Sequence, residues 1–539
     1  MKKIIAGAFI ALLPLATWAQ EKKTKLVVGV VVDQMRHEYL KRFEEHFSED
    51  GFKRLQREGF SVENMHYNYM PTTTGPGHAS IYTGTSPAYH GIVYNEWYDR
   101  NNNKVEYCVE DSTVRLIGNG NEKKYKRSPV NLLTTTITDE LEMCTGFESK
   151  VIGIAIKDRS AVLSAGHNPD GAYWYDGDSK EFVSSSYYME DLPKWLKKFN
   201  NKKLPDSYAK KQWTPLLSLD KYVNSRQDDA WYEDGYDGHK FPHHVEEEHG
   251  KRNFISDTPF GNDLIFDLAK ESIEAEQLGR NEVTDFLAIN FSSTDMIGHA
   301  FGPYSMEVED AYIRLDQNIA DLLKYLDEKI GEGEYLVFLT ADHGGSEVPA
   351  YLQEKKMPGG YFDKENCVKQ INDFLNQQYT VEEQWIDYID FFQINLNNAL
   401  LKKLNLRKEE VNQQVVELLE KRKEIARAFT ADRINLTDYS AGGYKGMLSR
   451  SYFPKRSGDV FYCLQSGWLY RSSRKGTSHG SPYVYDTHVP SIWFGNGVKQ
   501  GKSWDKKEIT DIAPTISALL GIKFPSGTTG SPIKELLHD

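Results

Sequence analysis

Apolar residues occur along this chain in short uninterrupted runs, and stretches with helical periodicity separate several of these runs. A strand that is covered on both faces is apolar at every position, so the runs predict buried parallel strands. Strands that alternate with helices predict an α/β fold, here a three-layer sandwich with helices on both faces of a mostly parallel central sheet. The predicted strands are 26–32, 62–70, 151–156, 284–291, 335–340, 460–464 and 490–494. The predicted helices are 78–83, 262–277, 308–330 and 509–520, with several helical segments around 39–58.

Two long segments interrupt this alternation. Residues 166–255 are rich in Asp, Gly, Tyr, Trp and Lys with weak periodicity, which is typical of surface loops or an inserted subdomain. Residues 346–455 contain polar helices, such as 409–427, and we interpret them as a second insertion that caps the site. The core is expected to resume at 460–464, so that 21–539 forms one domain with two inserted capping subdomains.

The first twenty residues, 1–20, have the pattern of a secretory signal peptide. Lys2 and Lys3 form its charged start, and 4–16 are mostly apolar. Cleavage after Ala19 or Gln20 roughly fits the small-residue rule. No later apolar run reaches the roughly 18–20 residues that a membrane span needs. We therefore predict an exported, soluble mature protein that has no membrane partner.

Charge and cysteine content narrow the class of protein further. The chain has 65 basic and 78 acidic residues, a net charge of −13, whereas a nucleic-acid binder needs a basic surface. We expect no nucleic-acid partner, and an anionic substrate would have to be held by local positive charge. Cys108, Cys144, Cys367 and Cys463 have no metal-type spacing. An oxidising compartment would allow one or two disulfides, whose pairing the sequence does not define.

The heptapeptide TTTGPGH, residues 72–78, stands between a predicted strand and a predicted helix. Pro76 suits the first turn of a helix because it has no N–H to donate, which places Thr74 near the N-cap. Helix N-termini attract anions through free N–H groups and the helix dipole, so a hydroxyl there can serve as the nucleophile in phosphoryl transfer. The structural alternative is a simple helix cap, which the seven residues alone favour.

Polar side chains follow most of the predicted strands. The carboxyl ends of parallel strands meet at the edge where open α/β sheets place their sites. Asp295 and His299 are four residues apart and would share one face of a helical turn. Taken singly, each such residue could equally be a helix cap, a turn residue or surface charge. The strand ends carry Asp33, Lys157, Arg159, Asp295, His299, Asp342 and His343, and turns carry Asn95 and His479.

Taken together, these residues predict a metal centre. Mixed Asp and His ligands suit Zn²⁺ or similar borderline ions. Seven candidate ligands in two sets would hold two ions about 4 Å apart, an arrangement that clamps the attacking and leaving oxygens of an in-line displacement. The candidate ligands are Asp33, Thr74, Asp295, His299, Asp342, His343 and His479.

Seven segments of the sequence resemble the alkaline phosphatase superfamily, and more closely its PafA-type periplasmic members. They are VVDQMR, TTTGPGH, YNEWYD, KDRS, STDMIGH, TADHGG and KGTSHGSPYVYD, and the resemblance runs from Lys25 to about Leu536. It implies an alkaline phosphatase-like fold with a single catalytic domain, a periplasmic location and hydrolysis of small-molecule phosphate monoesters. We also expect a monomer.

The resemblance further implies two Zn²⁺ ions and a role for each site residue. Thr74 would bridge a metal to the phosphate, attack phosphorus and form a phosphothreonine intermediate. No ligand set for a third ion, such as the Mg²⁺ of three-metal members, is evident, so Lys157 would take its electrostatic role. One Zn²⁺ would be held by Asp295, His299 and His479 and the other by Asp33, Asp342 and His343, while Asn95, Lys157 and Arg159 would bind the non-bridging phosphate oxygens.

Three other functions remain open from the sequence. The G-x-S-x-G pattern at 476–480 would make Ser478 the nucleophile of a carboxylesterase, but that motif needs a strand–turn–helix context. The same scaffold also serves phosphodiesterases, phosphonate hydrolases and sulfatases. Lys157 and Arg159 favour a dianionic monoester over a diester, and Thr74 cannot become the formylglycine of a sulfatase. A surface protein with a purely structural metal is the third, although structural zinc sites are usually rich in cysteine.

Overall fold

The computed structural model describes residues 23–121, 126–235, 238–246, 254–471 and 473–538. The predicted signal peptide, 1–20, lies outside these described residues. Within the part of the chain that the structure describes, no helix is both long and apolar enough to cross a membrane.

A ten-stranded sheet forms the centre of the molecule, and its middle five strands run parallel to one another. These five strands are buried along their whole lengths, as the uninterrupted apolar runs predict. They are, in spatial order, β11 (Tyr335–Thr340), β1 (Leu26–Val32), β10 (Asp285–Phe291), β7 (Val151–Ala155) and β8 (Gly171–Asp176). The sheet continues through β19 (Ser491–Gly495), β2 (Phe60–Val62) and β20 (Gly501–Ser503) on one side, and through β9 (Glu181–Ser185) and β6 (Leu116–Ile117) on the other.

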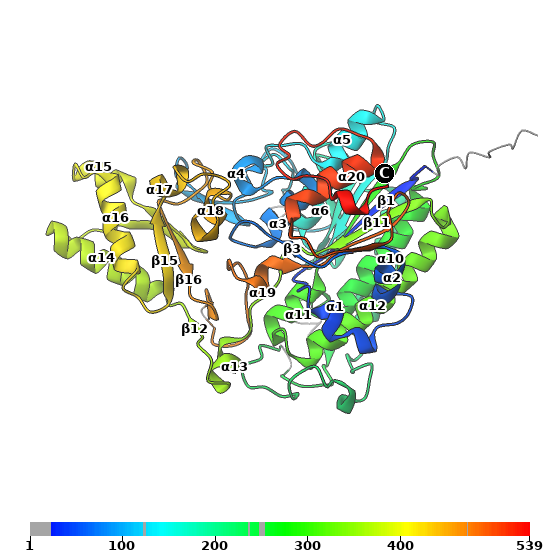
Figure 1. Cartoon of the computed structure of the whole chain (residues 1–539), viewed down its shortest axis with the longest axis horizontal. Helices are drawn as coiled ribbons and strands as arrows, with labels where there is room; N and C mark the ends of the chain where they lie inside the picture. The colour runs from blue at the N-terminus through cyan, green and yellow to red at the C-terminus, as the bar shows by residue number, and fades with distance from the viewer. Residues whose placement is uncertain (1–22, 122–125, 236–237, 247–253, 472, 539) are drawn as a thin grey trace, which may run out of the picture.

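Helices cover both faces of this sheet, which confirms the three-layer α/β arrangement (Figure 1). Apolar helix faces pack on the strands, and one hydrophobic core runs through all three layers. A second cluster joins 161–165 to Ala155, Ala172, Trp174 and Val183 of the sheet. One face carries α3 (Thr74–Thr83), α5 (Ile137–Cys144), α6 (Asp158–Ala165) and α20 (Ile512–Leu520), and the other carries α2 (Phe52–Glu58), α10 (Pro259–Ala275), α11 (Ser293–Phe301) and α12 (Met306–Leu326).

The helical segments predicted around 39–58 are α1 (Tyr39–Arg42), a 3₁₀ turn at Glu44–His46 and α2 in the structure. The start of α2 depends on a distant side chain that the local pattern does not contain. The carboxylate of Asp316 accepts hydrogen bonds from the backbone N–H groups of Ser48 and Phe52, both at 2.7 Å, and so caps the second helix.

The structure differs from the predicted surface loops or inserted subdomain in the first part of 166–255, because β8 and β9 extend the central sheet. All six residues of β8 are buried, including Tyr173, Trp174 and Tyr175. Their aromatic rings pack well in a strand covered on both faces, although Tyr and Trp make the segment look polar in a hydropathy pattern. The following helices, α7 (Lys194–Asn201) and α8 (Leu204–Ala209), also pack against the sheet's hydrophobic core.

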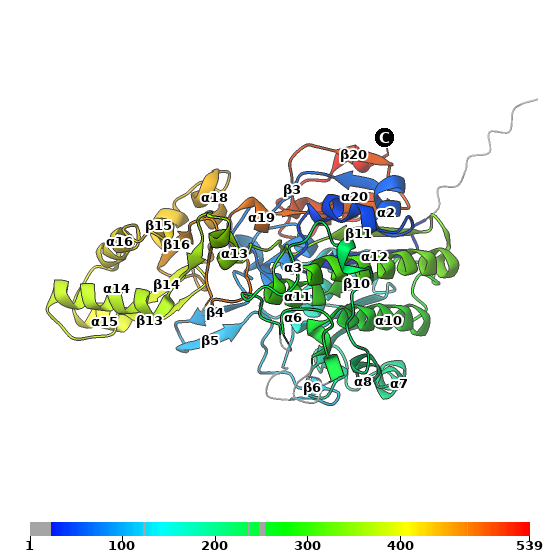
Figure 2. The same ribbon diagram turned by 90° about the horizontal axis from the view of Figure 1, so that it is seen from below.

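The segment Gly360–Tyr470, here called the capping segment, lies to one side of the main sheet (Figures 1 and 2). It has its own antiparallel sheet of β13 (Ile386–Asp390), β14 (Gln393–Leu396), β16 (Val460–Leu464) and β15 (Ile425–Thr430), and its own hydrophobic core. The strand predicted at 460–464 therefore belongs to this sheet and does not resume the main core. The predicted helix 409–427 ends early, as α16 (Lys408–Leu419), and its last residues start β15.

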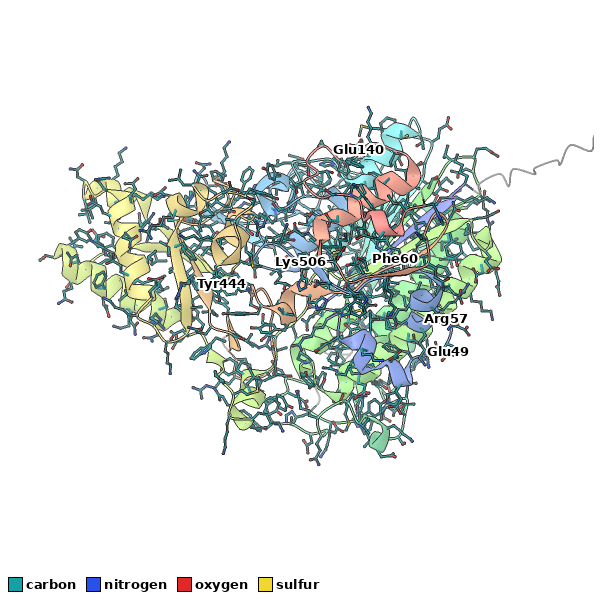
Figure 3. All side chains as sticks on the ribbon, in the orientation of Figure 1. Glu49, Arg57, Phe60, Glu140, Tyr444 and Lys506 are labelled. Carbon is teal, nitrogen blue, oxygen red and sulfur yellow. The ribbon has the colours of Figure 1, made fainter. Side chains whose placement is uncertain are left out.

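The capping segment contacts the main domain close to the segment that carries His479. Tyr444, labelled in Figure 3, lies in α18 (Gly443–Ser449), and its hydroxyl is 3.3 Å from that of Tyr483. All four cysteines are free thiols, so the disulfides that the sequence allowed do not form. Three of them are buried, each among apolar neighbours, and these are Cys108, Cys367 and Cys463.

Candidate active site

Four parallel strands end at one edge of the sheet and deliver most of the candidate residues there. Asp33 directly follows β1, and Asp342 and His343 follow β11. Because neighbouring parallel strands share a direction, the segments that follow their carboxyl ends must meet. The remaining two strands, β7 and β10, lead to Lys157 and Arg159 and to Asp295 and His299, the last two on α11.

Thr74 lies at the start of α3, as the heptapeptide predicts, but as the first helical residue and not as the cap. Thr73 is the N-cap, with extended backbone angles of φ −143° and ψ 162°. The helix ends at Gly84, which adopts a left-handed φ of 65° that glycine tolerates. The Thr74 side chain points into the site, where its hydroxyl lies 3.5 Å from Lys157 Nζ and 3.3 Å from Arg159 Nη2.

Lys157 links the two halves of the site. Its Nζ donates to Asp33 Oδ2 at 2.7 Å and to Asp295 Oδ2 at 2.6 Å. Burial alone would lower the pKa of Lys157, but Asp295 and Asp33 outweigh burial and raise it. The ammonium group is therefore held charged beside the Thr74 hydroxyl.

A buried network holds Arg159 next to Thr74. Its Nη1 donates to the Tyr107 hydroxyl at 3.2 Å, and that hydroxyl donates to Asp158 Oδ1 at 2.5 Å. Asn95 lies on the same side, where its Oδ1 accepts from the backbone N–H of Gly75 at 2.7 Å. This hydrogen bond fixes the amide with its NH₂ group as the available donor.

The three candidate histidines are oriented in the same way. In each, Nδ1 donates to a backbone carbonyl at 2.8 Å, which leaves Nε2 as the lone-pair nitrogen directed at the carboxylates. A hydrogen bond of this kind is the usual support of a metal-binding imidazole. The pairs are His299 with Thr477, His343 with Gly344, and His479 with Thr72.

Two groups of side chains are close enough to hold metal ions, each with ligand atoms within 4.8 Å of one another. One group, Asp33, Asp342 and His343, equals one of the sets that the resemblance implies. The other joins His343 to Asp295 and His479, where the resemblance implies His299. His299 is nevertheless close, since its Nε2 lies 3.3 Å from Asp295 Oδ1.

The chemistry of these groups fits cations. Asp33 Oδ1, Asp342 Oδ2 and His343 Nε2 are buried and have no hydrogen-bond partner among the described residues. Burial, with the neighbouring Asp342, raises the pKa of Asp33 to about 8, and burial raises the pKa of Asp342 to about 7. Buried carboxylates this close together need a compensating positive charge beyond Lys157, and divalent ions bound to Asp and His would supply it.

Sequence reasoning gave no role to Gln34 and His78, which both support the site. Gln34 adopts a left-handed φ of 63°, its N–H donates to Asp342 Oδ1 at 3.2 Å, and its Nε2 donates to Asp295 Oδ1 at 2.5 Å. His78 Nδ1 donates to the Thr74 carbonyl at 2.9 Å, and burial lowers the pKa of His78 to about 3, so the ring is neutral. Their positions next to Asp33 and inside the heptapeptide were the only signals in the sequence.

The carboxylesterase alternative lacks its structural context. Ser478 lies in a loop between β17 (Trp468–Leu469) and the four-residue helix α19 (Val484–Thr487), and no strand leads directly into it. That loop instead supplies Thr477 and His479 to the carboxylate cluster.

Comparison with known proteins identifies the family. Residues 27–488 match the type I phosphodiesterase / nucleotide pyrophosphatase family. A Myroides odoratus protein named calcium-transporting ATPase is 43% identical, over 100% of this chain and 99% of the relative. Alkaline phosphatase PafA of Elizabethkingia meningoseptica is 41% identical, over 96% of this chain and 95% of the relative.

Solved structures of alkaline phosphatase PafA match the whole fold. The wild-type crystal structure has a TM-score of 0.92 and 40% identity, over 96% of this chain and 99% of that chain. A PafA variant, with a TM-score of 0.92 and 39% identity over the same shares, is substituted at a threonine, an asparagine, a lysine and an arginine. The last three lie 21, 83 and 85 residues after the threonine, the same spacing that separates Asn95, Lys157 and Arg159 from Thr74 here. The chain therefore belongs to the type I phosphodiesterase / nucleotide pyrophosphatase family and is a PafA-type member of the alkaline phosphatase superfamily.

Proposed function

We propose that the protein hydrolyses small-molecule phosphate monoesters, with Thr74 as the nucleophile, and releases inorganic phosphate. The observation that carries the proposal is the position of the Thr74 hydroxyl, 3.5 Å from Lys157 and 3.3 Å from Arg159 beside the carboxylate–imidazole groups. The spacing shared with the substituted residues of the PafA variant supports the same four residues.

Each proposed residue has a task that its contacts support. Thr74 Oγ attacks phosphorus and forms a phosphothreonine intermediate, which water then hydrolyses. Arg159, Lys157 and the Asn95 amide bind the non-bridging oxygens, where negative charge is concentrated. His78 is neutral and holds the carbonyl of Thr74, which fixes the start of α3.

Two Zn²⁺ ions complete the proposed site. They would lower the pKa of the Thr74 hydroxyl and neutralise charge on the attacking and leaving oxygens. The proposed ligands are Asp33, Asp342 and His343 for one ion and Asp295, His299 and His479 for the other. Thr74 would be a further ligand and would link the metal to the phosphate. His343 is close to both sets in the structure, and the unpartnered buried atoms of the first set support an ion there.

A phosphodiesterase or phosphonate hydrolase is the second candidate, because the matching family takes its name from type I phosphodiesterases. A monoester dianion offers two charges to Lys157 and Arg159, whereas a diester offers one. Both cations lie within 3.5 Å of the Thr74 hydroxyl, which favours the monoester. We further propose that the protein is exported to the periplasm and acts there as a monomer.

The deciding experiment compares hydrolysis of a phosphate monoester with that of its methyl diester. We expect Thr74→Ala to reduce monoester kcat/KM by at least about 10³-fold, because no nucleophile remains. Lys157→Ala should reduce it by about 10²-fold, since one charged donor is lost. Thr74→Ser, which keeps a hydroxyl, and Lys369→Ala, which changes a lysine that is 72% exposed, serve as controls.

A Lys157→Ala enzyme that keeps the wild-type preference for the monoester would contradict the substrate assignment. Full activity in Thr74→Ala would contradict the proposed nucleophile. Trapping of ³²P on wild-type Thr74 after an acid quench, and its absence in Thr74→Ala, would test the intermediate directly.

A further inference from the structure

A cavity of about 680 Å³ lies between the capping segment and the loop that leads to His479. Its walls combine aromatic rings with charged side chains, of which three are cationic and two, Asp363 and Glu365, are acidic. The chemistry proposed above uses none of them. The residues that matter here are Phe391, Tyr470, Lys364, Arg471 and Arg474.

Two contacts place this cavity beside the active site. The ring of Phe391 lies 4.6 Å from the ring of Tyr94, the residue before Asn95. Arg471 Nη1 donates at 2.9 Å to the carbonyl of Thr477, which also accepts the Nδ1 hydrogen of His299. The cavity therefore adjoins both the phosphate-binding amide and one candidate metal ligand.

Among the described carboxylates and imidazoles of the site, His299 has the most exposed side chain, at 27%, whereas that of His479 is 8% exposed. The side chains of Asp33, Asp342 and His343 are fully buried. Thr74 itself is 1% exposed. In an in-line displacement the leaving oxygen lies opposite the nucleophile, so the leaving group must project away from the buried Thr74 hydroxyl.

A strained hairpin holds Phe391 in the wall of the cavity. Phe391 and Phe392 form the two-residue turn between β13 and β14, with φ angles of 25° and 69°. Such turns normally use Asn or Gly, because bulky residues are strained at positive φ. Phe392 is buried in the core of the capping segment, while the half-buried Phe391 faces Tyr94 and lies 5.0 Å from the ring of Tyr470. Strain of this kind is typical of functional positions.

We propose that this cavity binds the leaving group of the substrate and selects leaving groups that join an aromatic ring to a further anionic group. The proposal rests on the phosphatase activity proposed above. The ring would stack on Phe391 and Tyr470. Lys364 Nζ lies 5.8 Å from the centroid of Tyr470, so a charge on the leaving group would find a cation beside the stacked ring.

Arg471 gives the cavity a second cation close to the reaction. Its Nη2 donates to Asp234 at 2.9 Å, while its Nε is buried and has no hydrogen-bond partner among the described residues. Nucleoside triphosphates, which would lose their terminal phosphoryl group, and carboxylated aryl phosphates both have the required chemistry. In either case a bond from Thr74 Oγ to phosphorus forms as the bond to the leaving oxygen breaks. The leaving oxygen keeps the electron pair of the broken bond and takes up the proton that Thr74 loses. Water later forms a bond to phosphorus as the bond from phosphorus to Thr74 Oγ breaks, and a proton of that water returns to Thr74 Oγ.

The test measures kcat/KM for methyl phosphate, phenyl phosphate, 4-carboxyphenyl phosphate and ATP. We expect Phe391→Ala to lower the ratio of phenyl to methyl phosphate by about 5-fold, as lost aromatic stacking predicts. Lys364→Glu should lower the ratio of carboxyphenyl to phenyl phosphate by about 5-fold, as expected when an attractive charge becomes repulsive. The controls are Leu436→Ala, at a residue 85% exposed, and Lys369→Glu, on the same helix as Lys364.

Equal losses on all four substrates in both variants would overturn the leaving-group cavity while leaving the phosphatase proposal intact. Absence of hydrolysis of every substrate by the wild-type enzyme would instead overturn the phosphatase proposal. If Lys364→Glu lowered kcat/KM for ATP and left that for 4-carboxyphenyl phosphate unchanged, the cavity would select nucleotides and not anionic aromatic leaving groups in general. Tyr470→Ala tests the opposite wall if Phe391→Ala does not fold.

Discussion

At the scale of single residues, the surroundings of Thr74 favour the proposed role as nucleophile over that of a helix cap. Thr73 takes the cap position, which leaves the Thr74 hydroxyl free to face Lys157 and Arg159. The cations are themselves held by side chains with no visible motif. Tyr107 is one of these, because its hydroxyl joins Arg159 to Asp158.

We predict that Tyr107→Phe lowers kcat/KM for a phosphate monoester by about 10-fold. The substitution keeps the ring but removes the hydroxyl that accepts from Arg159, a hydrogen bond to a charged group. The loss for a diester should be smaller, because a diester offers Arg159 one negative charge fewer than a monoester does. Steady-state kinetics on both substrates measure the effect.

Tyr98→Phe is the matched control. Tyr98 lies on β4 (Glu96–Asp99), which pairs with β5 (Lys104–Tyr107), and its hydroxyl donates at 3.2 Å to Oδ1 of the exposed Asn103. Equal effects of the two substitutions would show that Tyr107 acts through the stability of the hairpin and not through Arg159.

At the scale of elements, close packing of α3 on the loop after β11 sets the distance between Thr74, the proposed nucleophile, and the carboxylates. Gly77 makes this approach possible. A Cβ atom at this position would lie 2.4 Å from the Asp342 carbonyl oxygen and 2.8 Å from the Asp342 Cβ. No real side chain tolerates these distances, so any larger residue must push the helix away from the loop.

We therefore expect Gly77→Ala to reduce monoester kcat/KM by about 10²-fold, because a shift of about 1 Å misplaces Thr74 relative to its partners. Kinetics together with a thermal unfolding curve separate misplacement from unfolding. Gly442→Ala is the control, since a Cβ there would meet no atom within 4 Å. Wild-type activity in Gly77→Ala would contradict the role of this contact.

At the scale of the whole molecule, the candidate metal ligands come from segments that are far apart in the chain and meet only in the folded protein. Asp33 and His479 are separated by most of the sequence, yet both lie in groups that include His343. Ions bound there would link the ends of β1, β10 and β11 to the loop near the capping segment. Binding to the folded state alone would also stabilise it.

We predict that chelation abolishes monoesterase activity and lowers the unfolding temperature by several degrees. A ligand present at about 1,000 times its dissociation constant contributes about 4 kcal/mol of stability, which chelation would remove. Zn²⁺ should restore both properties, and elemental analysis should give two zinc ions per chain without tightly held Mg²⁺. Asp295→Asn should retain less zinc.

Full activity in protein shown to be free of metal would contradict the proposed cofactor. Tightly held Mg²⁺ beside two zinc ions would contradict the electrostatic role given to Lys157. If chelation abolished activity but left the unfolding temperature unchanged, the ions would act in the reaction without stabilising the fold.

The sequence alone determined the main strands and the residues at their ends, and it predicted the chemistry that we propose. Uninterrupted apolar runs predict β1, β10 and β11, because a strand that is buried on both faces is apolar at nearly every position. The resemblance to PafA-type enzymes then named the family, which the comparisons confirmed.

Only the tertiary structure decided which sheet 460–464 joins, that β8 and β9 extend the central sheet, and that Gln34, His78 and Tyr107 support the site. It also decided that Phe391 reaches from the capping segment to Tyr94. These features depend on contacts between residues far apart in the chain, as does the start of α2, where the Asp316 carboxylate accepts from the Phe52 N–H. A local pattern of apolar and polar residues indicates whether a residue is buried, but it does not indicate which distant side chain packs against it.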